Sequence, residues 1–109
     1  MSESIKKKTE CGKGYIWYRN DKFLGVVHRE DGPAVEYHNG YKEWWVHGNR
    51  HRLNGPSIEI PNGKKFWFIN NHNVTYEITT WAKENDIDLD NLTDVDKALI
   101  KLVWSDYEK

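Results

Sequence analysis

The sequence has little cysteine and no long apolar run. Its 109 residues include one cysteine, Cys11, so no disulfide can form within the chain. A lone thiol persists best in a reducing compartment. No stretch approaches the roughly 18 apolar residues of a transmembrane helix, and no apolar segment follows the lysines of Met1–Lys8, so we expect no signal peptide. These absences predict a cytoplasmic protein without a membrane span.

The motifs of common catalytic and metal sites are also missing. The chain has no phosphate-binding loop, no Ser–His–Asp order and no cysteine cluster. Asp86-Ile87-Asp88-Leu89-Asp90 is similar to the start of a calcium loop, but Asn91 stands where glycine is needed and Lys97 where the bidentate glutamate should be. We therefore expect no enzyme, no bound metal and no cofactor.

Aromatic residues are abundant and the charge is unevenly distributed. Six Trp, six Tyr and three Phe are present, and each ring can bury roughly 150–250 Å². Residues 1–74 hold 12 Lys/Arg against 8 Asp/Glu, whereas residues 75–109 hold 4 against 9. This asymmetry predicts either attraction between a basic sheet and an acidic C-terminal part, or a charged docking face.

Two tandem copies of one unit, residues 28–50 and 51–73, organise the chain. At a shift of 23 residues they match at His28/His51, Arg29/Arg52, Gly32/Gly55, Pro33/Pro56, Glu36/Glu59, Asn39/Asn62, Gly40/Gly63, Lys42/Lys65 and Trp44/Trp67. A fixed period of this length indicates a repeat architecture.

Each copy contains a β-hairpin signal. Asn39-Gly40 and Asn62-Gly63 lie between runs of β-formers, which predicts type I′ turns. Gly48-Asn49 and Asn70-Asn71 predict further turns. Before the two copies, residues 12–27 are expected to form a degenerate first repeat. It would comprise strands Tyr15–Tyr18 and Phe23–Val27 around a turn at residues 20–22, with Trp17 in the role of Trp44. Residues 1–11 are expected to be disordered.

The hairpins are predicted to place rings on both faces of the sheet. Alternation along residues 43–47 and 65–69 puts Trp44 and Trp67 on one side, and Trp45 and Phe68 on the other. A sheet with one wet face needs no rings on that face. We therefore expect the second face to be covered by the C-terminal helices, the N-terminal segment, a second copy or a partner.

From Thr75 the apolar period becomes helical. Residues 75–85 and a segment following the N-cap Thr93 are expected to be helices. In the second, an apolar stripe consists of Val95, Ala98, Leu99, Leu102 and Val103, widened by Ile100, Trp104 and Tyr107. We predict an α+β fold: an antiparallel meander of about three hairpins over residues 12–74, then a helical pair over residues 75–109 that packs on one face of the sheet.

The period of 23 residues with the run Trp45-Val46-His47-Gly48-Asn49-Arg50-His51 resembles the MORN repeat family. It is most similar to the variant repeats, of the form His-Arg-x-Asp-Gly-Pro-Ala…Asn-Gly…Trp, of tailed bacteriophages and large viruses. The resemblance covers residues 28–73. It implies stacked hairpins with a protein-interaction role, in some members phospholipid contact, and for a viral protein an inhibitor or modulator of a host protein.

The repeated polar residues are interpreted mainly as scaffold. His28 and His51 are expected to fix turns by hydrogen bonds, because equivalent residues lie one repeat apart and cannot easily share a metal. Arg29 and Arg52 either pair with the acidic residues Asp31, Glu36 and Glu59 or form an anion-binding stripe. Glu36 and Glu59 recur with the fold, which favours a structural ion pair over acid–base catalysis.

The functional hypothesis is a non-enzymatic protein-interaction module that binds a host protein. The partner contacts are predicted at Trp45, Phe66 and Phe68, with Arg29, Arg50 and Arg52 as their rim. A homodimer through the same face is the competing arrangement. The alternative is a module that binds an anion, a nucleotide, a phospholipid or a nucleic acid; the net charge of −1 disfavours nucleic acid.

Overall fold

A computed structural model describes residues 4–20 and 25–104 of the chain, and it confirms the α+β class. The strands and helices follow in the order β1 Ser4–Lys8, β2 Gly14–Arg19, β3 Val35–Tyr37, β4 Lys42–Glu43, β5 Trp45–Val46, β6 Asn49–Arg50, β7 Ile58–Glu59, β8 Lys65–Phe66, β9 Phe68–Ile69, β10 His72–Asn73, α1 Thr75–Glu84 and α2 Asp94–Trp104. All strand pairs are antiparallel.

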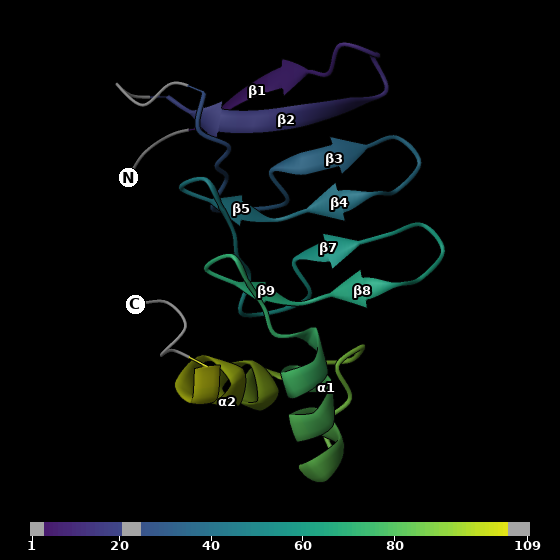
Figure 1. Ribbon diagram of the computed structural model, residues 1–109, viewed down its shortest axis with the longest axis vertical. Helices are drawn as coiled ribbons and strands as arrows, with labels where there is room; N and C mark the ends of the chain where they lie inside the picture. The colour runs from purple at the N-terminus through teal and green to yellow at the C-terminus, as the bar shows by residue number, and fades with distance from the viewer. Residues whose placement is uncertain (1–3, 21–24, 105–109) are drawn as a thin grey trace.

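The main sheet is a six-stranded meander in the order β1-β2-β3-β4-β7-β8. The pairs β5-β6 and β9-β10 form two small ribbons beside it (Figure 1). The sequence predicted one continuous strand over residues 43–47. The structure ends β4 at Glu43 and begins β5 at Trp45. The Trp44 N–H still donates to the Ser57 carbonyl of the main sheet (2.8 Å), but the Trp44 carbonyl accepts the N–H of His51 (3.0 Å), and the chain leaves the main sheet after Trp44.

The same backbone contacts recur from one repeat to the next. Trp44 N–H donates to the carbonyl of Ser57, and Trp17 N–H donates in the same way to the carbonyl of Ala34 (2.8 Å each). The His51 N–H donates to the Trp44 carbonyl (3.0 Å), and the His28 N–H to the Trp17 carbonyl (2.9 Å). Trp17 therefore occupies, one repeat earlier, the structural position of Trp44.

The Asn-Gly turns differ from the type I′ prediction. Gly40 and Gly63 have positive φ angles of 100° and 93°, but the asparagines before them do not. Each asparagine uses its side chain instead: the Asn39 Oδ1 accepts the N–H of Tyr41 at 3.0 Å. A three-residue loop with a left-handed glycine fits this geometry. Two successive positive φ angles occur at the ribbon turns, 49° and 82° at His47-Gly48 and 49° and 71° at Asn70-Asn71.

The N-terminal segment corrects a third prediction. Disorder was expected over residues 1–11, yet Ser4–Lys8 forms β1 and pairs with β2 from Ser4↔Arg19 to Lys8↔Tyr15. The Lys6 Nζ lies 4.1 Å from the centre of the Tyr15 ring, a contact that stabilises this pairing. The turn and the strand expected over residues 20–27 fall partly outside the described residues; Val27 forms a bridge with Tyr18.

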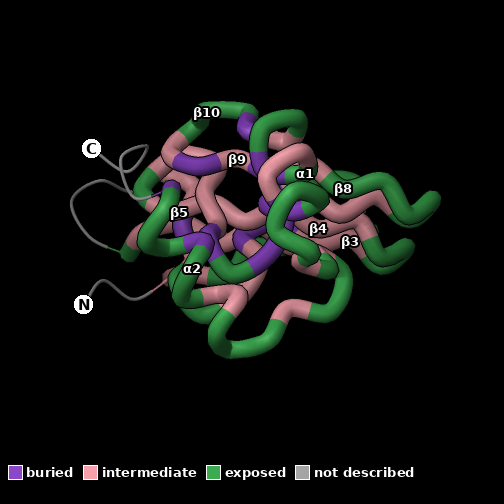
Figure 2. Tube along the Cα trace, turned by 90° about the horizontal axis from the view of Figure 1, so that it is seen from below, coloured by how far each residue is buried: buried purple, intermediate pink, exposed green. Residues whose placement is uncertain are grey.

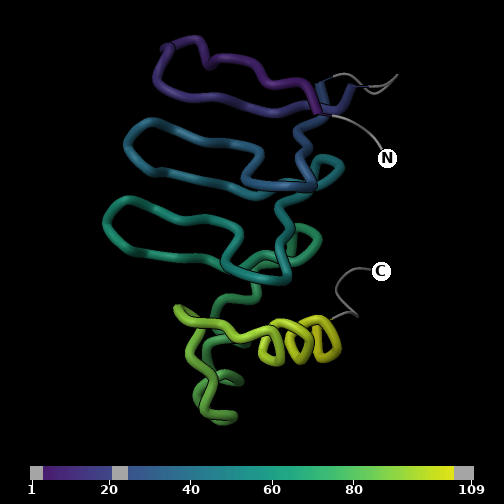
Figure 3. Tube along the Cα trace, turned by 180° about the vertical axis from the view of Figure 1, so that it is seen from behind, coloured from purple at the N-terminus to yellow at the C-terminus, as the bar shows by residue number. Residues whose placement is uncertain are grey.

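Both helices lie beyond β8 and β9, at the end of the stack of hairpins (Figures 1 and 3). The prediction that they pack on one face of the sheet is therefore wrong. Val74 explains why the helices lie at the end of the stack. It stands one period after His51, and its N–H donates to the carbonyl of Trp67 (2.8 Å), just as the His51 N–H donates to the carbonyl of Trp44. The helices occupy the place where the next repeat would stand.

The main hydrophobic core lies between the helices and the last repeat. It comprises Leu53, Trp67, Ile69, Val74, Ile78, Ile100 and Trp104. Buried segments cluster around β9, β5 and the helices, whereas the tips of the long hairpins are exposed (Figure 2). The described part of the chain contains no helix long and apolar enough to cross a membrane.

The second helix buries a different side from the one predicted. Ile100 and Trp104 are buried, whereas Val95, Leu99 and Leu102 of the predicted core stripe are exposed. Ile100 and Trp104, four residues apart, fill the space between α2 and α1. There the Trp81 and Trp104 rings meet edge to face, with their centres 6.3 Å apart. Tyr107 lies outside the described residues. The Thr93 cap is confirmed by reciprocal bonds of 3.1 Å with Asp96.

Candidate functional site: the apolar face of the sheet

The strand register divides the main sheet into two chemically different faces. Directly paired residues of an antiparallel sheet point to the same side, and neighbours along a strand point to opposite sides. One side, here named the charged face, carries Lys6, Lys8, Tyr15, Trp17, Glu36, Lys42, Glu59 and Lys65. Glutamate and lysine alternate from β3 to β8, but the four lysines of this face outnumber its two glutamates, so the face carries a net positive charge.

The opposite side, here named the apolar face, is lined by aliphatic and aromatic residues. It carries Ile5, Ile16, Tyr18, Val35, Tyr37, Tyr41, Glu43, Ile58, Ile60 and Phe66, with Trp45 and Phe68 beside them. The exposed Lys7, which pairs with Ile16, also points to this side, at the edge strand β1. Among the other residues of this face, Val35 is buried and the rest are half-buried. Within residues 4–20 and 25–104, no helix or strand covers this face, as both broad views of the molecule show (Figures 1 and 3).

Glu43 is the polar centre of the apolar face. Its Oε2 accepts the Tyr41 hydroxyl at 2.7 Å, and its Oε1 accepts both the Trp45 indole N–H at 2.9 Å and the Arg50 Nε–H at 3.0 Å. The Arg50 guanidinium lies 4.8 Å from the Trp45 ring centre and 5.5 Å from the Phe68 ring centre. One carboxylate thereby fixes the orientation of two rings and one cation.

The protonation of this cluster follows from its burial. Burial alone would raise the pKa of Glu43, but the hydrogen bonds from Tyr41, Arg50 and Trp45 outweigh it and lower the pKa. Burial, followed by the hydrogen bond to Glu43, raises the pKa of Tyr41 to about 12. At neutral pH the carboxylate is charged and the phenol is neutral, so all the hydrogen bonds can form.

The two repeats differ most at this point. Phe66 stands one period after Glu43, and Lys64 one period after Tyr41. Phe66 pairs with Ile58 and continues the row Ile16, Val35, Glu43. The second repeat therefore extends the apolar face as a plain hydrophobic surface, next to the polar cluster of the first.

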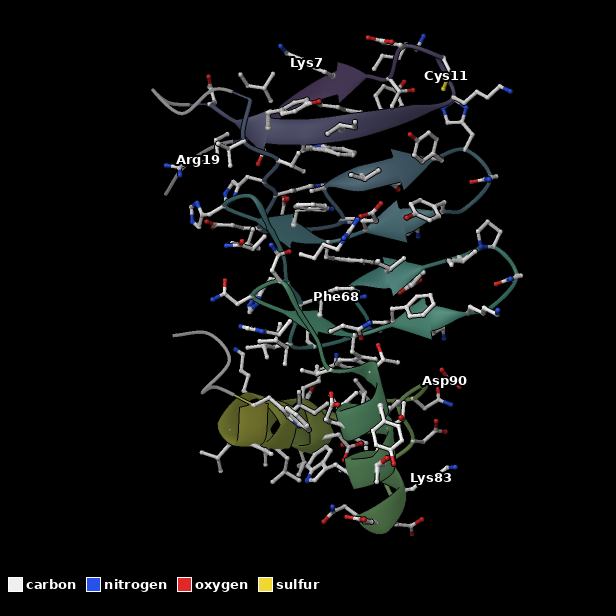
Figure 4. All side chains as sticks on the ribbon, in the orientation of Figure 1. Lys7, Cys11, Arg19, Phe68, Lys83 and Asp90 are labelled. Atoms are coloured by element: carbon white, nitrogen blue, oxygen red, sulfur yellow. The ribbon has the colours of Figure 1, made fainter. Side chains whose placement is uncertain are left out.

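The six residues predicted as partner contacts do not all lie together. Trp45, Phe68 and Arg50 form one cluster, and Phe66 lies on the same face. Figure 4 shows Phe68 on the ribbon side of the molecule, far from Cys11 at the β1–β2 turn. The apolar-face residues that the sequence reasoning missed, such as Tyr37 and Ile58, could have been found from the same strand alternation.

Arg29 and Arg52 lie on the charged face and are held by internal contacts. Arg52 is stacked 3.8 Å above the Trp44 ring, and its Nη1 donates to the Pro56 carbonyl (3.0 Å) and to Glu59 (3.2 Å). Arg29 repeats this arrangement, 4.1 Å above the Trp17 ring. The prediction that they pair within the repeat is confirmed. The backbone N–H groups of Arg29 and Arg52 donate to the carbonyls of Trp45 (3.0 Å) and Phe68 (3.2 Å), but their guanidinium groups lie on the charged face and not beside the Trp45 and Phe68 rings.

The repeated histidines fix the ribbon turns, as predicted. The Nδ1 of His28 accepts the His47 N–H, and the Nδ1 of His51 accepts the Asn70 N–H, both at 2.9 Å. His28 is completely buried. These bonds join the start of each repeat to its last turn.

His28, Glu30 and His47 offer ligand atoms within 4.8 Å of one another, the spacing of a metal site. The bond to Nδ1 requires the neutral His28 ring to carry its proton on Nε2, which lies 3.4 Å from the Glu30 Oε1. A metal on Nε2 would move that proton to Nδ1, against the donating His47 N–H. The donor set therefore suits a buried hydrogen bond better than a metal.

Two grooves lie along the charged face. The larger, about 910 Å³, runs between the segments that follow His28 and His51 and reaches Lys101; the smaller, about 520 Å³, lies over β1–β4. Lys6, Arg29 and Lys42 line the smaller groove together with Tyr15 and Trp17. Lys6 and Arg29 already stack on these rings, and Lys42 stands between Glu36 and Glu59 in the strand register.

Comparison with known proteins gives no match: no family model, no curated protein and no solved structure is similar to the chain. The function is therefore inferred from the two sheet faces and their residues.

Proposed function

We propose that the chain is a non-enzymatic protein-interaction module that binds a partner protein through the apolar face. The observation that carries this proposal is the row of Ile16, Val35, Glu43, Ile58 and Phe66 across the main sheet, which is apolar except at Glu43 and has no covering layer among the described residues. Partly exposed apolar surface that extends over several strands is typical of interaction sites.

The cluster around Glu43 supports a protein partner in particular. Energetically important interface residues are enriched in Trp, Tyr and Arg, and they are most effective when rigid. Trp45, Tyr41 and Arg50 all bond to the Glu43 carboxylate before any partner arrives. Binding would then cost little side-chain entropy. Phe66 and Phe68 would supply the adjoining apolar contact.

A bacterial host protein is the proposed partner. This part of the proposal rests on the resemblance of residues 28–73 to MORN-like repeats of phage and viral proteins. The partner surface should be apolar at its centre, with a carboxylate at its edge opposite Arg50.

The test is affinity purification of a bacterial lysate on the immobilised chain, with mass spectrometry of the retained proteins. Trp45→Ala and Phe66→Ala should each reduce the specifically retained protein at least tenfold, because each removes a large contact from the apolar face. Tyr15→Ala is the matched control: it removes a half-buried aromatic ring from the charged face and should leave retention unchanged.

Circular dichroism of each variant separates loss of binding from loss of the fold. If folded Trp45→Ala and Phe66→Ala variants retain the same protein as the parent chain, the apolar face is not the binding site. If only Tyr15→Ala loses the retained protein, the binding site lies on the charged face instead.

A second candidate function is anion or nucleotide binding in the smaller groove. The observation that favours it is the combination of cations and aromatic rings at Lys6, Lys42, Tyr15 and Trp17. Titration with ATP and with inorganic phosphate in a calorimeter tests it. Heat that disappears in Lys42→Ala would support this function, and no heat with either probe would exclude it for these anions.

A further inference from the structure

The outer side of α2 is the most exposed apolar surface among the described residues. Its members are Val95, Leu99, Leu102 and Val103, with exposed fractions of 68%, 39%, 76% and 46%. Ala98, between them, is also exposed. The opposite side of the helix is the one that packs on the core, through Ile100 and Trp104. The exposed stripe is therefore additional to what the fold needs.

The spacing of the stripe suits packing against another helix. Positions 95, 98, 99 and 102 recur at intervals of three and four residues, which places them along one side of a helix. The stripe is purely aliphatic, without the aromatic and polar groups of the apolar face. Its physical character therefore differs from that of the proposed host-binding site.

The charges beside the stripe indicate the orientation of the second helix. Asp94 and Lys101 are seven residues apart, so they lie on the same flank, about 10.5 Å apart along the axis. In an antiparallel pair, the flank of one helix meets the same flank of the other in reverse order. An aspartate then lies beside a lysine twice, whereas a parallel pair would bring this flank against the opposite flank of the partner helix, which carries Asp96 and no lysine. The helix dipoles also favour the antiparallel arrangement.

We propose that two copies of this chain associate through α2, packed antiparallel along Val95, Leu99 and Leu102, with Asp94 of each copy beside Lys101 of the other. The stripe is self-complementary in shape and charge, as a two-fold interface requires. Because α2 caps the end of the stack (Figure 1), the apolar face stays accessible in the dimer.

The size of the stripe sets the strength of this dimer. One short helix exposes a few hundred square ångströms of apolar surface, so two copies bury less than the roughly 1,200 Å² of a standard interface. The dimer should be weak and concentration-dependent, with a dissociation constant on the order of micromolar or higher.

Sedimentation velocity of the whole chain, at protein concentrations from about 1 µM to about 1 mM, measures the weak dimerisation that an interface of this size predicts. The parent chain should shift from monomer to dimer, and Leu102→Asp should remain monomeric over the same range. Tyr76→Asp is the matched control, because Tyr76 on α1 is equally exposed at 76%; this variant should dimerise like the parent chain.

Charge reversal tests the orientation. Asp94→Lys and Lys101→Asp should each weaken association at least threefold, and the double variant should restore it. A strictly monomeric parent chain would overturn the proposal, as would a dimer that survives Leu102→Asp. Dimerisation abolished by Phe66→Ala but not by Leu102→Asp would assign self-association to the apolar face. Host-protein retention is measured separately, so the two proposals can fail independently.

Discussion

Replacement of Glu43 by glutamine tests whether one carboxylate organises the apolar face. The side chain of Glu43 is 12% exposed and accepts hydrogen bonds from Tyr41, Trp45 and Arg50. Glutamine has nearly the same volume, so Glu43→Gln removes the charge without creating a cavity. Glutamine also has only one acceptor oxygen, so its amide nitrogen cannot accept a hydrogen bond on the other side of the cluster.

The magnitude follows from the charge. Hydrogen bonds to a charged group contribute about 1.5–3 kcal/mol and neutral ones about 1 kcal/mol. Arg50 is partly exposed, which reduces its share through solvent screening. We therefore expect Glu43→Gln to lower the free energy of unfolding by about 2 kcal/mol at pH 7. Glu36→Gln is the control, since Glu36 is 38% exposed and lies 3.8 Å from Arg29; it should change stability little.

The pH dependence supplies a second check. The hydrogen bonds hold the pKa of Glu43 below the value of about 4.3 expected for an unfolded chain. A carboxyl group with a lowered folded pKa stabilises the fold above its unfolded pKa, and this contribution is lost as the pH falls through the folded pKa. The difference in the free energy of unfolding between the parent chain and Glu43→Gln should therefore become smaller below about pH 4. Urea unfolding at pH 7, 5 and 3 measures it. A difference that stays constant down to pH 3 would refute the assigned role of the charge.

Three further substitutions test other parts of the fold. His28→Ala leaves the His47 N–H without its acceptor and removes a buried ring, so it should lower the free energy of unfolding by about 2–4 kcal/mol in urea. Trp104→Ala removes the ring that α2 packs on the core. We expect a loss of about 3–5 kcal/mol by thermal unfolding. Asp90 lies on the connector between the helices (Figure 4), and its carboxylate forms an exposed ion pair with Lys65 at 2.9 Å. Asp90→Asn removes this pair and should leave the unfolding midpoint unchanged, both at low salt and at about 0.5 M salt. A His28→Ala variant with the stability of the parent chain, or a strongly destabilised Asp90→Asn variant, would contradict these assignments.

The repeat predicts the scaffold well because each matched residue makes the same local contact twice. Alternation of side chains correctly separates Trp44 from Trp45, since each lies within a few residues of the strand pair that orients it. The hydrogen bonds of His28 and His51 to the ribbon turns were also predictable, because a residue that recurs with the fold is under the geometric constraint of the fold.

The parts that the sequence could not predict depend on contacts between distant segments. Nothing near Trp44 signals that the strand leaves the main sheet there, because its two backbone groups bond to different segments, the N–H to Ser57 and the carbonyl to His51. The second helix is apolar around most of its circumference, from Val95 and Leu99 to Ile100 and Trp104. Its period identifies a helix but not which side faces the core. That choice depends on the space left beside Trp81.

The start of α1 shows that the period continues beyond the last repeat. Val74 and Thr75 stand one period after His51 and Arg52, and Val74 makes the His51-type bond to Trp67. The Trp67 N–H donates to the Thr75 Oγ1 at 2.9 Å, where Trp44 uses the carbonyl of Ser57. The helices thus attach to the stack through the same groups that would attach a further hairpin.

A second copy of residues 51–73, inserted between Asn73 and Val74, should therefore fold as an added repeat. Repeats that contact only their neighbours gain one interface for each unit inserted, so the unfolding midpoint of this chain should equal or exceed that of the parent. The control inserts residues 51–70 only, which shifts Val74 out of register with Trp67. Thermal unfolding followed by circular dichroism compares the two. If both insertions destabilise the chain equally, the helices do not recognise the repeat period, and the position of Val74 is a coincidence of sequence.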